Sequence, residues 1–241
     1  MVEGGPPLAN LARILERYPV VQHGVSLNIA AAQPLDFDYL GKLKKLCRLT
    51  GTPWVSDPLC WSGAHNHHYH DLLPVPYTSE NAAFIAEKAR IVQDYLELPF
   101  ALENLSSYVS FSDSEMTEWA FYRQVVEQAD VHMMLDVNNV FVSSVNHGFD
   151  PLAYLEALPM ERVIQTHVAG HTTLENGTLL DTHDNHVRPE VWELYGYVSR
   201  QTGGVSTILE WDDNYLSFEE TWAEAAPARA YQNETQNASR A

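Results

Sequence analysis

Short apolar runs alternate with amphipathic segments along most of this 241-residue chain. An apolar run bounded by turn-forming residues is typical of a buried strand, and apolar residues three or four positions apart are typical of one helix face. Such near-strict alternation predicts an α/β fold with a parallel sheet and right-handed helical crossovers. The sheet can be a TIM barrel or an open parallel sheet, and in both the C-terminal strand ends carry the active site.

The pattern predicts one domain, residues 1–230, followed by a polar tail at residues 231–241 that we expect to be disordered. The expected strands are residues 20–25, 54–57, 99–103, 132–136, 162–167 and 205–210. The expected helices are residues 8–18, 36–50, 79–96, 114–128, 150–158, 189–200 and 217–230. Residues 58–78, rich in His and Pro, are expected to form a long loop.

The chain is strongly acidic, with a formal charge of −18 from 14 Lys and Arg against 32 Asp and Glu. Because there is no surplus of cations to neutralise phosphates, duplex nucleic acid is not expected as a partner. No segment approaches the roughly 18 uninterrupted apolar residues of a membrane span. The first residues lack the basic and apolar regions of a signal peptide, so Cys47 and Cys60 are expected to be reduced thiols in the cytoplasm, with Cys60 buried.

Each expected strand ends in a side chain that can bind a metal ion. These side chains are His23, Asp57, Glu103, Asp136, His167 and Glu210. The segment after the fifth strand adds Asp181 and His183. A single such residue is more often a cap or turn residue, but independent turn chemistry would also place Asn, Ser, Gly and Lys at these six ends. Since C-terminal strand ends converge on one face, the pattern favours a shared metal site.

The donor set indicates which metals are suitable. His23, His167 and His183 supply imidazoles, the carboxylates are Glu103, Asp136, Asp181 and Glu210, and no thiolate is included. Structural zinc usually draws cysteine, whereas an oxygen-rich set with some histidine suits Mn, Fe or a catalytic Zn pair. Seven donors exceed the need of one ion that keeps open positions, so two or three ions are expected. The sequence has no nucleophile elbow, phosphate loop or dinucleotide fingerprint.

Other polar residues near these ends have different expected roles. Asp57 and His147 are catalytic candidates, and His147 is expected in a loop where it can hold the substrate or a carboxylate. His171 is expected to contact the metal ligands and orient them, without binding the ion itself. A further cluster, expected to be solvated or to face substrate, comprises His65, His67, His68 and His70.

At these residues the chain resembles the multinuclear non-haem iron-dependent oxidative enzymes, a family that includes the iron enzyme of methanobactin biosynthesis. The resemblance extends from Met1 to about Ala230. The motifs that carry it are HGVSL at 23–27, SDPLCW at 56–61, DLLPVPY at 71–77, EN at 103–104, LDVNN at 135–139, NHGFD at 146–150, HVAGH at 167–171, DTHD at 181–184 and EWDD at 210–213.

The resemblance implies a TIM-barrel-like fold that holds two or three irons. It implies dioxygen-dependent oxidation of cysteine in a ribosomally made precursor peptide, with an oxazolone–thioamide or related heterocycle as product. A separate small protein often recognises the precursor. By motif position, the implied iron ligands are His23, Glu103, Asp136, His167, Asp181, His183 and Glu210.

The sequence departs from the family at two places. The family usually has a histidine where this chain has Pro58, so one iron is expected to lose a ligand or to take one from Asp57 or from residues 65–70. The family's usual N-terminal portion is also missing, and six strands are visible where a TIM barrel has eight. We therefore expect an incomplete, N-terminally truncated barrel. Such a barrel exposes sheet edges.

Two other functions remain compatible with the sequence. A divalent-metal isomerase or phosphodiesterase on a similar barrel could use the same carboxylates and imidazoles, without needing dioxygen. A truncated, metal-poor relative that only binds a partner is favoured by Pro58 and by the missing strands.

Overall fold

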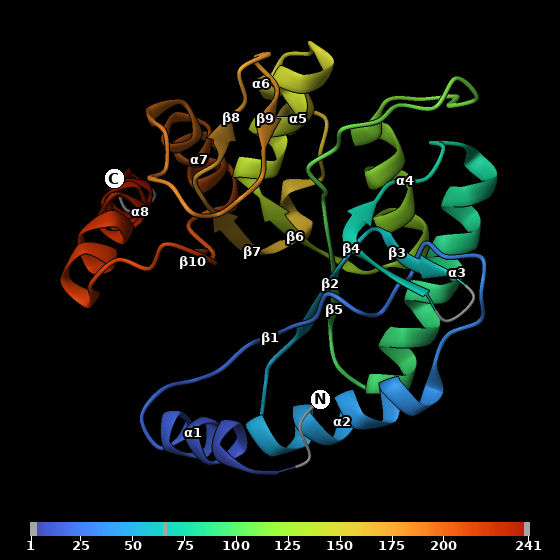
Figure 1. Cartoon of the computed structure of the whole chain (residues 1–241), viewed down its shortest axis with the longest axis horizontal. Coiled ribbons are helices and arrows are strands. Elements are labelled where there is room, and N and C mark those ends of the chain that lie inside the picture. The colour runs from blue at the N-terminus through green and yellow to red at the C-terminus, as the bar shows by residue number, and fades with distance from the viewer. Residues whose placement is uncertain (1–3, 65–66, 239–241) are drawn as a thin grey trace.

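A computed structural model describes residues 4–64 and 67–238, in which six parallel strands form one curved sheet. The strands, in their spatial order, are β1 (Gln22–His23), β2 (Val55–Pro58), β5 (Phe100–Glu103), β6 (His132–Asp136), β7 (Val163–Val168) and β10 (Ser206–Leu209). Every neighbouring pair is parallel. The sheet is half of a TIM-like barrel (Figure 1), which confirms the predicted fold class and the predicted six strands.

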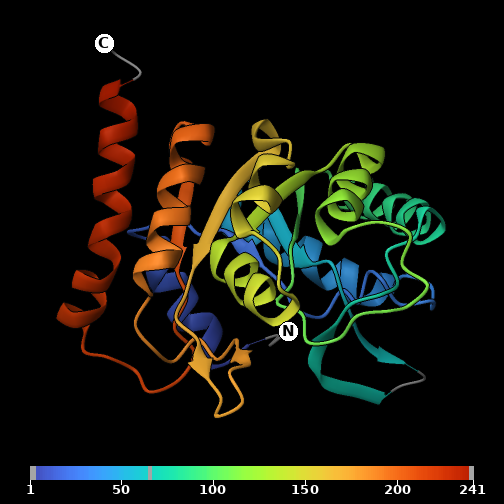
Figure 2. The same cartoon turned by 90° about the horizontal axis from the view of Figure 1, so that it is seen from above.

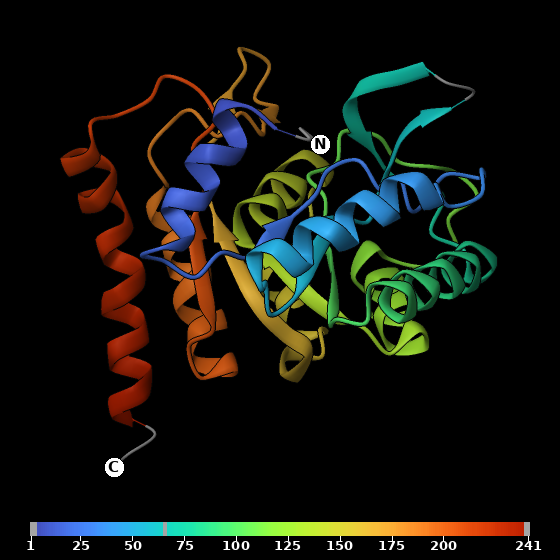
Figure 3. The same ribbon diagram turned by 90° about the horizontal axis from the view of Figure 1, so that it is seen from below.

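Helices connect the strands and cover one side of the sheet. They are α1 (Pro6–Leu15), α2 (Phe37–Thr50), α3 (Ser79–Leu96), α4 (Glu118–Ala129), α5 (Val137–His147), α6 (Pro151–Glu156), α7 (Pro189–Thr202) and α8 (Phe218–Ala238). Seen from above, α7 and α8 lie side by side near the β10 end of the sheet, and α3 and α4 lie together on the opposite side of the view (Figure 2). Seen from below, α1 and α2 are nearest the viewer (Figure 3).

The core forms where apolar strand residues meet the apolar faces of these helices. Phe100, Leu102, Met133 and Leu135 are fully buried in the sheet, and the α3 residue Ile85 packs in the same cluster. Each fully buried side chain of this size stabilises the fold by roughly 1.5–3 kcal/mol. The sheet is thereby a rigid support for the side chains that follow its strands.

Several segments differ from the sequence-based expectation. The expected loop at residues 58–78 contains an antiparallel hairpin of β3 (Trp61–Ala64) and β4 (His67–Leu73). The hairpin was missed because β3 is only four residues long and β4 is mostly polar and rich in histidine. Helix α5 was also missed, since Asp136 ends β6 and caps α5 directly through the Asn139 N–H (2.7 Å), with no linker between the two elements.

The prediction of a disordered tail from Tyr231 is wrong for residues 231–238, which continue helix α8. The Gln232 amide donates to the Val205 carbonyl at 2.9 Å, and the Tyr231 ring packs against Gly196 so closely that a Cβ there would lie 2.6 Å away. These contacts with the α7–β10 region hold the last turns of the helix.

The sheet has two outer strands, β1 and β10, and within the described residues each pairs on one side only. A second small ladder, β8 (Thr172–Thr173) with β9 (Leu179–Leu180), projects beyond the C-terminal end of β7. None of the helices in the described part of the chain is long and apolar enough to cross a membrane.

Candidate metal centre

Four predicted ligands meet at the C-terminal ends of neighbouring strands. Glu103 ends β5, Asp136 ends β6, His167 lies near the end of β7, and Glu210 directly follows β10. One donor atom from each residue lies within 4.8 Å of the others, so a single ion can reach all four. We call these four residues the inner group. Glu103, Asp136 and His167 are buried, and Glu210 is half-buried.

The electrostatics of the inner group fit a cation. Burial raises the pKa of Glu103 to about 8 and that of Asp136 to about 7, with further upward contributions from neighbouring carboxylates. The Asp136 Oδ2 atom is buried and has no hydrogen-bond partner, and the buried His167 Nδ1 atom faces carboxylate oxygens. A buried polar atom without a partner is costly, and a bound metal ion would satisfy Asp136 Oδ2.

Glu210 differs from the other carboxylates of the inner group. Burial alone would raise its pKa, but the adjacent His167 and then His183 outweigh this and lower it to about 2. The His167 Nδ1 atom lies 3.2 Å from Glu210 Oε2 and 3.6 Å from Glu103 Oε1. Glu210 is therefore an anionic donor at neutral pH.

A buried amide orients the His167 ring. The Trp54 indole donates to Gln165 Oε1 at 2.8 Å, and the Gln165 amide nitrogen lies 3.0 Å from His167 Nε2. Because an indole N–H can only donate, the amide oxygen must face Trp54. This contact leaves Nδ1 as the ring nitrogen that faces Glu103 and Glu210.

His23, at the end of β1, borders the inner group. Its Nε2 lies 3.3 Å from Glu103 Oε2, its Nδ1 lies 2.8 Å from Ser56 Oγ, and its ring meets His167 edge-on at 5.3 Å. Burial lowers the pKa of His23 despite the nearby carboxylates. The ring is therefore held neutral, as metal ligation requires.

A second set of donors adjoins the first. His183, Glu210 and Asp212 also have donor atoms within 4.8 Å of one another, and we call them the outer group. Asp181 lies 2.7 Å from His183 Nε2, while His183 Nδ1 lies 3.5 Å from Glu210. Burial disfavours the charged His183 ring, but the hydrogen bond and charge of Asp181 outweigh this and raise its pKa to about 10.

Asp212 was not among the predicted ligands. It follows Glu210 by two positions, the spacing that places side chains on one face of an extended segment. That spacing was a usable signal within the EWDD motif. The other omission was Gln165, whose role depends on its contact with Trp54, 111 positions away, and could not have been read from local sequence.

Asp57, a predicted catalytic residue, belongs to neither group. Its carboxylate accepts the Leu27 N–H at 3.3 Å and approaches the backbone at Gly24, where a Cβ would lie 2.4 Å from Oδ2. Burial raises its pKa to about 7, although His23 opposes the shift. Asp57 thus supports the segment that follows His23.

His147, the other predicted catalytic residue, is the last residue of α5, so its expected loop position is wrong. Its Nε2 lies 3.0 Å from the Ser107 carbonyl oxygen and 2.8 Å from the Ser107 hydroxyl. This pair borders a hollow of about 320 Å³ whose apolar lining includes Val109, Phe111, Met116, Trp119 and Phe149. Among the described contacts, none joins His147 to the inner or outer group.

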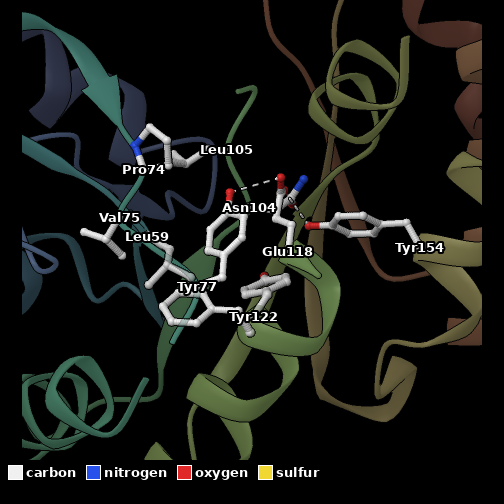
Figure 4. A pocket seen from close by; sticks show the side chains of 10 residues that line it. Leu59, Pro74, Val75, Tyr77, Asn104, Leu105, Glu118, Tyr122 and Tyr154 are labelled. Atoms are coloured by element: carbon white, nitrogen blue, oxygen red, sulfur yellow. Dashed lines mark hydrogen bonds between the residues drawn. The ribbon is translucent and has the colours of Figure 1, made fainter. Parts of the chain in front are cut away.

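A small cavity (Figure 4) shares Tyr77 and Glu118 with this hollow. Glu118 accepts hydrogen bonds there from Tyr77 at 3.2 Å and Tyr154 at 3.0 Å. Burial raises the pKa of Glu118 to about 7, and the tyrosine and serine hydroxyls only partly offset it. The volume of about 20 Å³ is enough for roughly one water molecule.

The histidine cluster of the hairpin contributes to neither group among the described residues. His67 is exposed at the start of β4. His65 and the side chains of His68 and His70 lie outside what the structure describes. Pro58 ends β2 beside Glu103 in the parallel register, next to the inner group.

The fold and these side chains define a TIM-barrel-like protein with a candidate metal centre of buried His, Glu and Asp. Residues 1–233 match the family of RiPP precursor modification enzymes MbnB/TglH/ChrH, where RiPP denotes a ribosomally synthesised and post-translationally modified peptide. The chain belongs to this family. The resemblance inferred from its motifs is thereby confirmed.

Similar proteins occur in distant bacteria. A UPF0276 protein of Acaryochloris marina is 42% identical over 228 residues, covering 95% of this chain and 82% of that protein. A UPF0276 protein of Caulobacter vibrioides is 44% identical over 230 residues, with the same two coverages of 95% and 82%.

Solved structures share the fold at low identity. Endonuclease IV from Thermus thermophilus gives a TM-score of 0.62 at 18% identity, over 97% of this chain and 85% of that one. An L-ribulose 3-epimerase gives 0.59 at 14% identity, over 100% and 83%. These likenesses show the fold alone.

Proposed function

We propose that this protein uses two or three iron ions and dioxygen to oxidise cysteine in a ribosomally made precursor peptide, giving an oxazolone–thioamide or a related heterocycle. One observation carries the multinuclear part of the proposal. Glu210 belongs to both the inner and the outer group, so it would supply a donor to each of two ions. Family membership supports the peptide substrate.

Seven residues would hold the ions: His23, Glu103, Asp136, His167, Asp181, His183 and Glu210. Asp212 is an additional candidate ligand from the outer group. Oxygen and imidazole donors without thiolate fit iron, and leave the substrate thiol as a sulfur donor from outside. Bound iron would supply the redox chemistry and a Lewis-acidic position for the cysteine sulfur and dioxygen.

The chain's own residues prepare this site. Gln165 fixes the His167 ring so that Nδ1 faces the carboxylates. Glu103 and Asp136, whose pKa values are raised, release protons when an ion binds, so metal binding becomes tighter as pH rises. Burial of these side chains excludes bulk water from the reacting groups.

The proposal includes the partners and the compartment. A cysteine-containing precursor peptide is the substrate, and a small separate protein presents it. Cys47 and Cys60 are buried and unpaired, which fits a reducing cytoplasm. The acidic composition fits neither nucleic acid nor an anionic membrane surface as partner.

Anaerobic reconstitution with Fe²⁺ tests the function. We expect two or three irons per chain, and oxygen consumption when a cysteine-containing precursor peptide is added. The same peptide with serine in place of cysteine is the control, because it lacks the thiol. Protein that binds no iron would contradict the proposal. Turnover that depends on Zn²⁺ or Mn²⁺ and proceeds without dioxygen would also contradict it and would favour the isomerase or phosphodiesterase alternative.

A further inference from the structure

Asp181 lies outside the regular strands, so its carboxylate must be held by side chains. It follows β9, and three groups surround it. The Ser106 hydroxyl donates to Oδ2 at 2.8 Å, the Asn138 amide donates to Oδ1 at 2.7 Å, and His183 Nε2 lies 2.7 Å from the same Oδ1. Of these, Asn138 is fully buried and comes from the first turn of α5.

The Asn138 amide has a partner at each end. Its nitrogen faces Asp181, and its oxygen lies 2.7 Å from His171 Nδ1. Because a carboxylate and an amide oxygen both accept, the amide nitrogen must donate to Asp181 and His171 Nδ1 must carry a proton. The His171 ring is 3% exposed and packs against Phe141 at 5.4 Å, so its orientation is restricted.

We infer that His171 is a positioning residue of the metal centre, acting through Asn138 on the Asp181 carboxylate. Without the His171 N–H, the Asn138 amide oxygen loses the contact that holds it, and the side chain can rotate away from Asp181. The Asp181 Oδ1 atom would then lose its amide donor. Asp181 would turn away from His183, and the metal ion held by this pair would bind more weakly. The inference rests on the metal-binding part of the proposed function.

The turn that presents His171 also holds the other partner of Asp181. The His183 N–H donates to the Gly170 carbonyl at 3.2 Å. A Cβ on residue 170 would lie 1.9 Å from the Asn185 carbonyl oxygen, so only glycine permits this close approach. Residues 170 and 171 therefore fix both members of the Asp181–His183 pair, one through the backbone and one through Asn138.

Two variants of His171 separate the hydrogen bond from the packing. His171→Asn keeps an N–H donor near the position of Nδ1, whereas His171→Leu keeps apolar bulk against Phe141 but has no donor. Anaerobic titration with Co²⁺, followed by its visible absorption bands, and Fe²⁺ content per chain are the readouts. We expect His171→Leu to lose about 10–100-fold in affinity for one ion with altered bands, and His171→Asn to stay within about threefold of wild type.

A double-mutant cycle with Asn138→Leu tests whether His171 acts through Asn138. In the Asn138→Leu protein, adding His171→Leu should cause no further loss of Co²⁺ affinity, because the His171–Asn138–Asp181 contact is already broken.

Equal Co²⁺ affinity and spectra in wild type and His171→Leu would overturn the inference while leaving the metal site intact. Additive losses in the cycle would also overturn it. Wild-type protein that binds neither Co²⁺ nor Fe²⁺ would instead overturn the proposed function itself. If His171→Leu does not fold, Co²⁺ affinity is compared among the wild-type, His171→Asn and Asn138→Leu proteins. The inference then predicts weaker binding by Asn138→Leu alone, and equal binding by all three would overturn it.

Discussion

Asp212 is joined to His183 twice. Its N–H donates to the His183 carbonyl at 2.8 Å, and its Oδ2 lies 3.2 Å from His183 Nδ1. His183 has a φ of 49°, in the left-handed region that costs energy for a residue other than glycine. The double link holds His183 in this conformation with its ring toward Asp181 and Glu210.

Asp212→Ala should lower the metal content by up to one ion per chain, or lower the affinity for that ion about tenfold, because it removes a charged donor of the outer group. Metal analysis after reconstitution measures this. Asp213→Ala is the matched control, since Asp213 is also exposed and caps only its neighbour Asn214. Equal metal content in both variants would rule out a ligand role for Asp212.

Pro58→His should add a ligand to the inner group. Residues 56 and 58 of a strand face the same side, and Ser56 already touches His23 from that side. Position 58 also lies opposite Glu103 in the β2–β5 register. We expect tighter binding of one iron and greater cysteine-dependent oxygen uptake. Pro58→Ala, which removes the proline without adding a donor, should show neither change. An equal gain in both variants would contradict ligation by the introduced imidazole.

Glu118→Gln should flatten the pH dependence of stability. Burial raises the pKa of Glu118 from 4.5 to about 7, so the folded protein holds a proton that the unfolded chain has released across this window. The free energy of unfolding therefore falls as pH rises from about 4.5 to 7, by on the order of 2–3 kcal/mol for this residue.

Urea unfolding of metal-free protein between pH 4.5 and 8 measures the effect. The Gln variant should lose less stability over this range than wild type. A residual slope should remain, because the pKa values of the buried Asp57, Glu103 and Asp136 are also raised. Glu219→Gln, on an exposed part of α8, is the control. A variant slope equal to that of wild type would show that Glu118 does not titrate in this window.

Gly170→Ala should destabilise the protein by more than about 2 kcal/mol, because the added Cβ collides with the Asn185 backbone, which cannot move like a flexible side chain. Gly41→Ala in helix α2 is the contrasting control. Its Cβ would meet only the Tyr95 hydroxyl at 3.4 Å, and alanine favours the helix by about 0.5–1 kcal/mol. Thermal unfolding of the two variants should therefore shift in opposite directions. A small loss of stability in Gly170→Ala would show that the backbone of residues 182–186 can move to accommodate the added methyl group.

The sequence contained most of the fold and the inner group because both follow from local patterns. Apolar runs in or beside the strands marked their positions, and the polar residue at or just after each strand end reaches the shared face by the geometry of parallel strands. The hairpin and α5 were missed for local reasons too, since β3 is short and made largely of small residues, β4 is mostly polar, and α5 begins without a linker. The contacts of Gln165 with Trp54 and of Asn138 with His171 join residues far apart in the chain, and only folding reveals them.

The membership of Glu210 in both groups has a thermodynamic consequence. Two ions that share one carboxylate do not bind independently. Whatever factor the first ion imposes on the affinity of the second, the second imposes equally on the first. In the proposed two-ion centre, metal binding would be a linked process with a single coupling free energy, and replacing Glu210 with a neutral residue would change that coupling as well as both individual affinities.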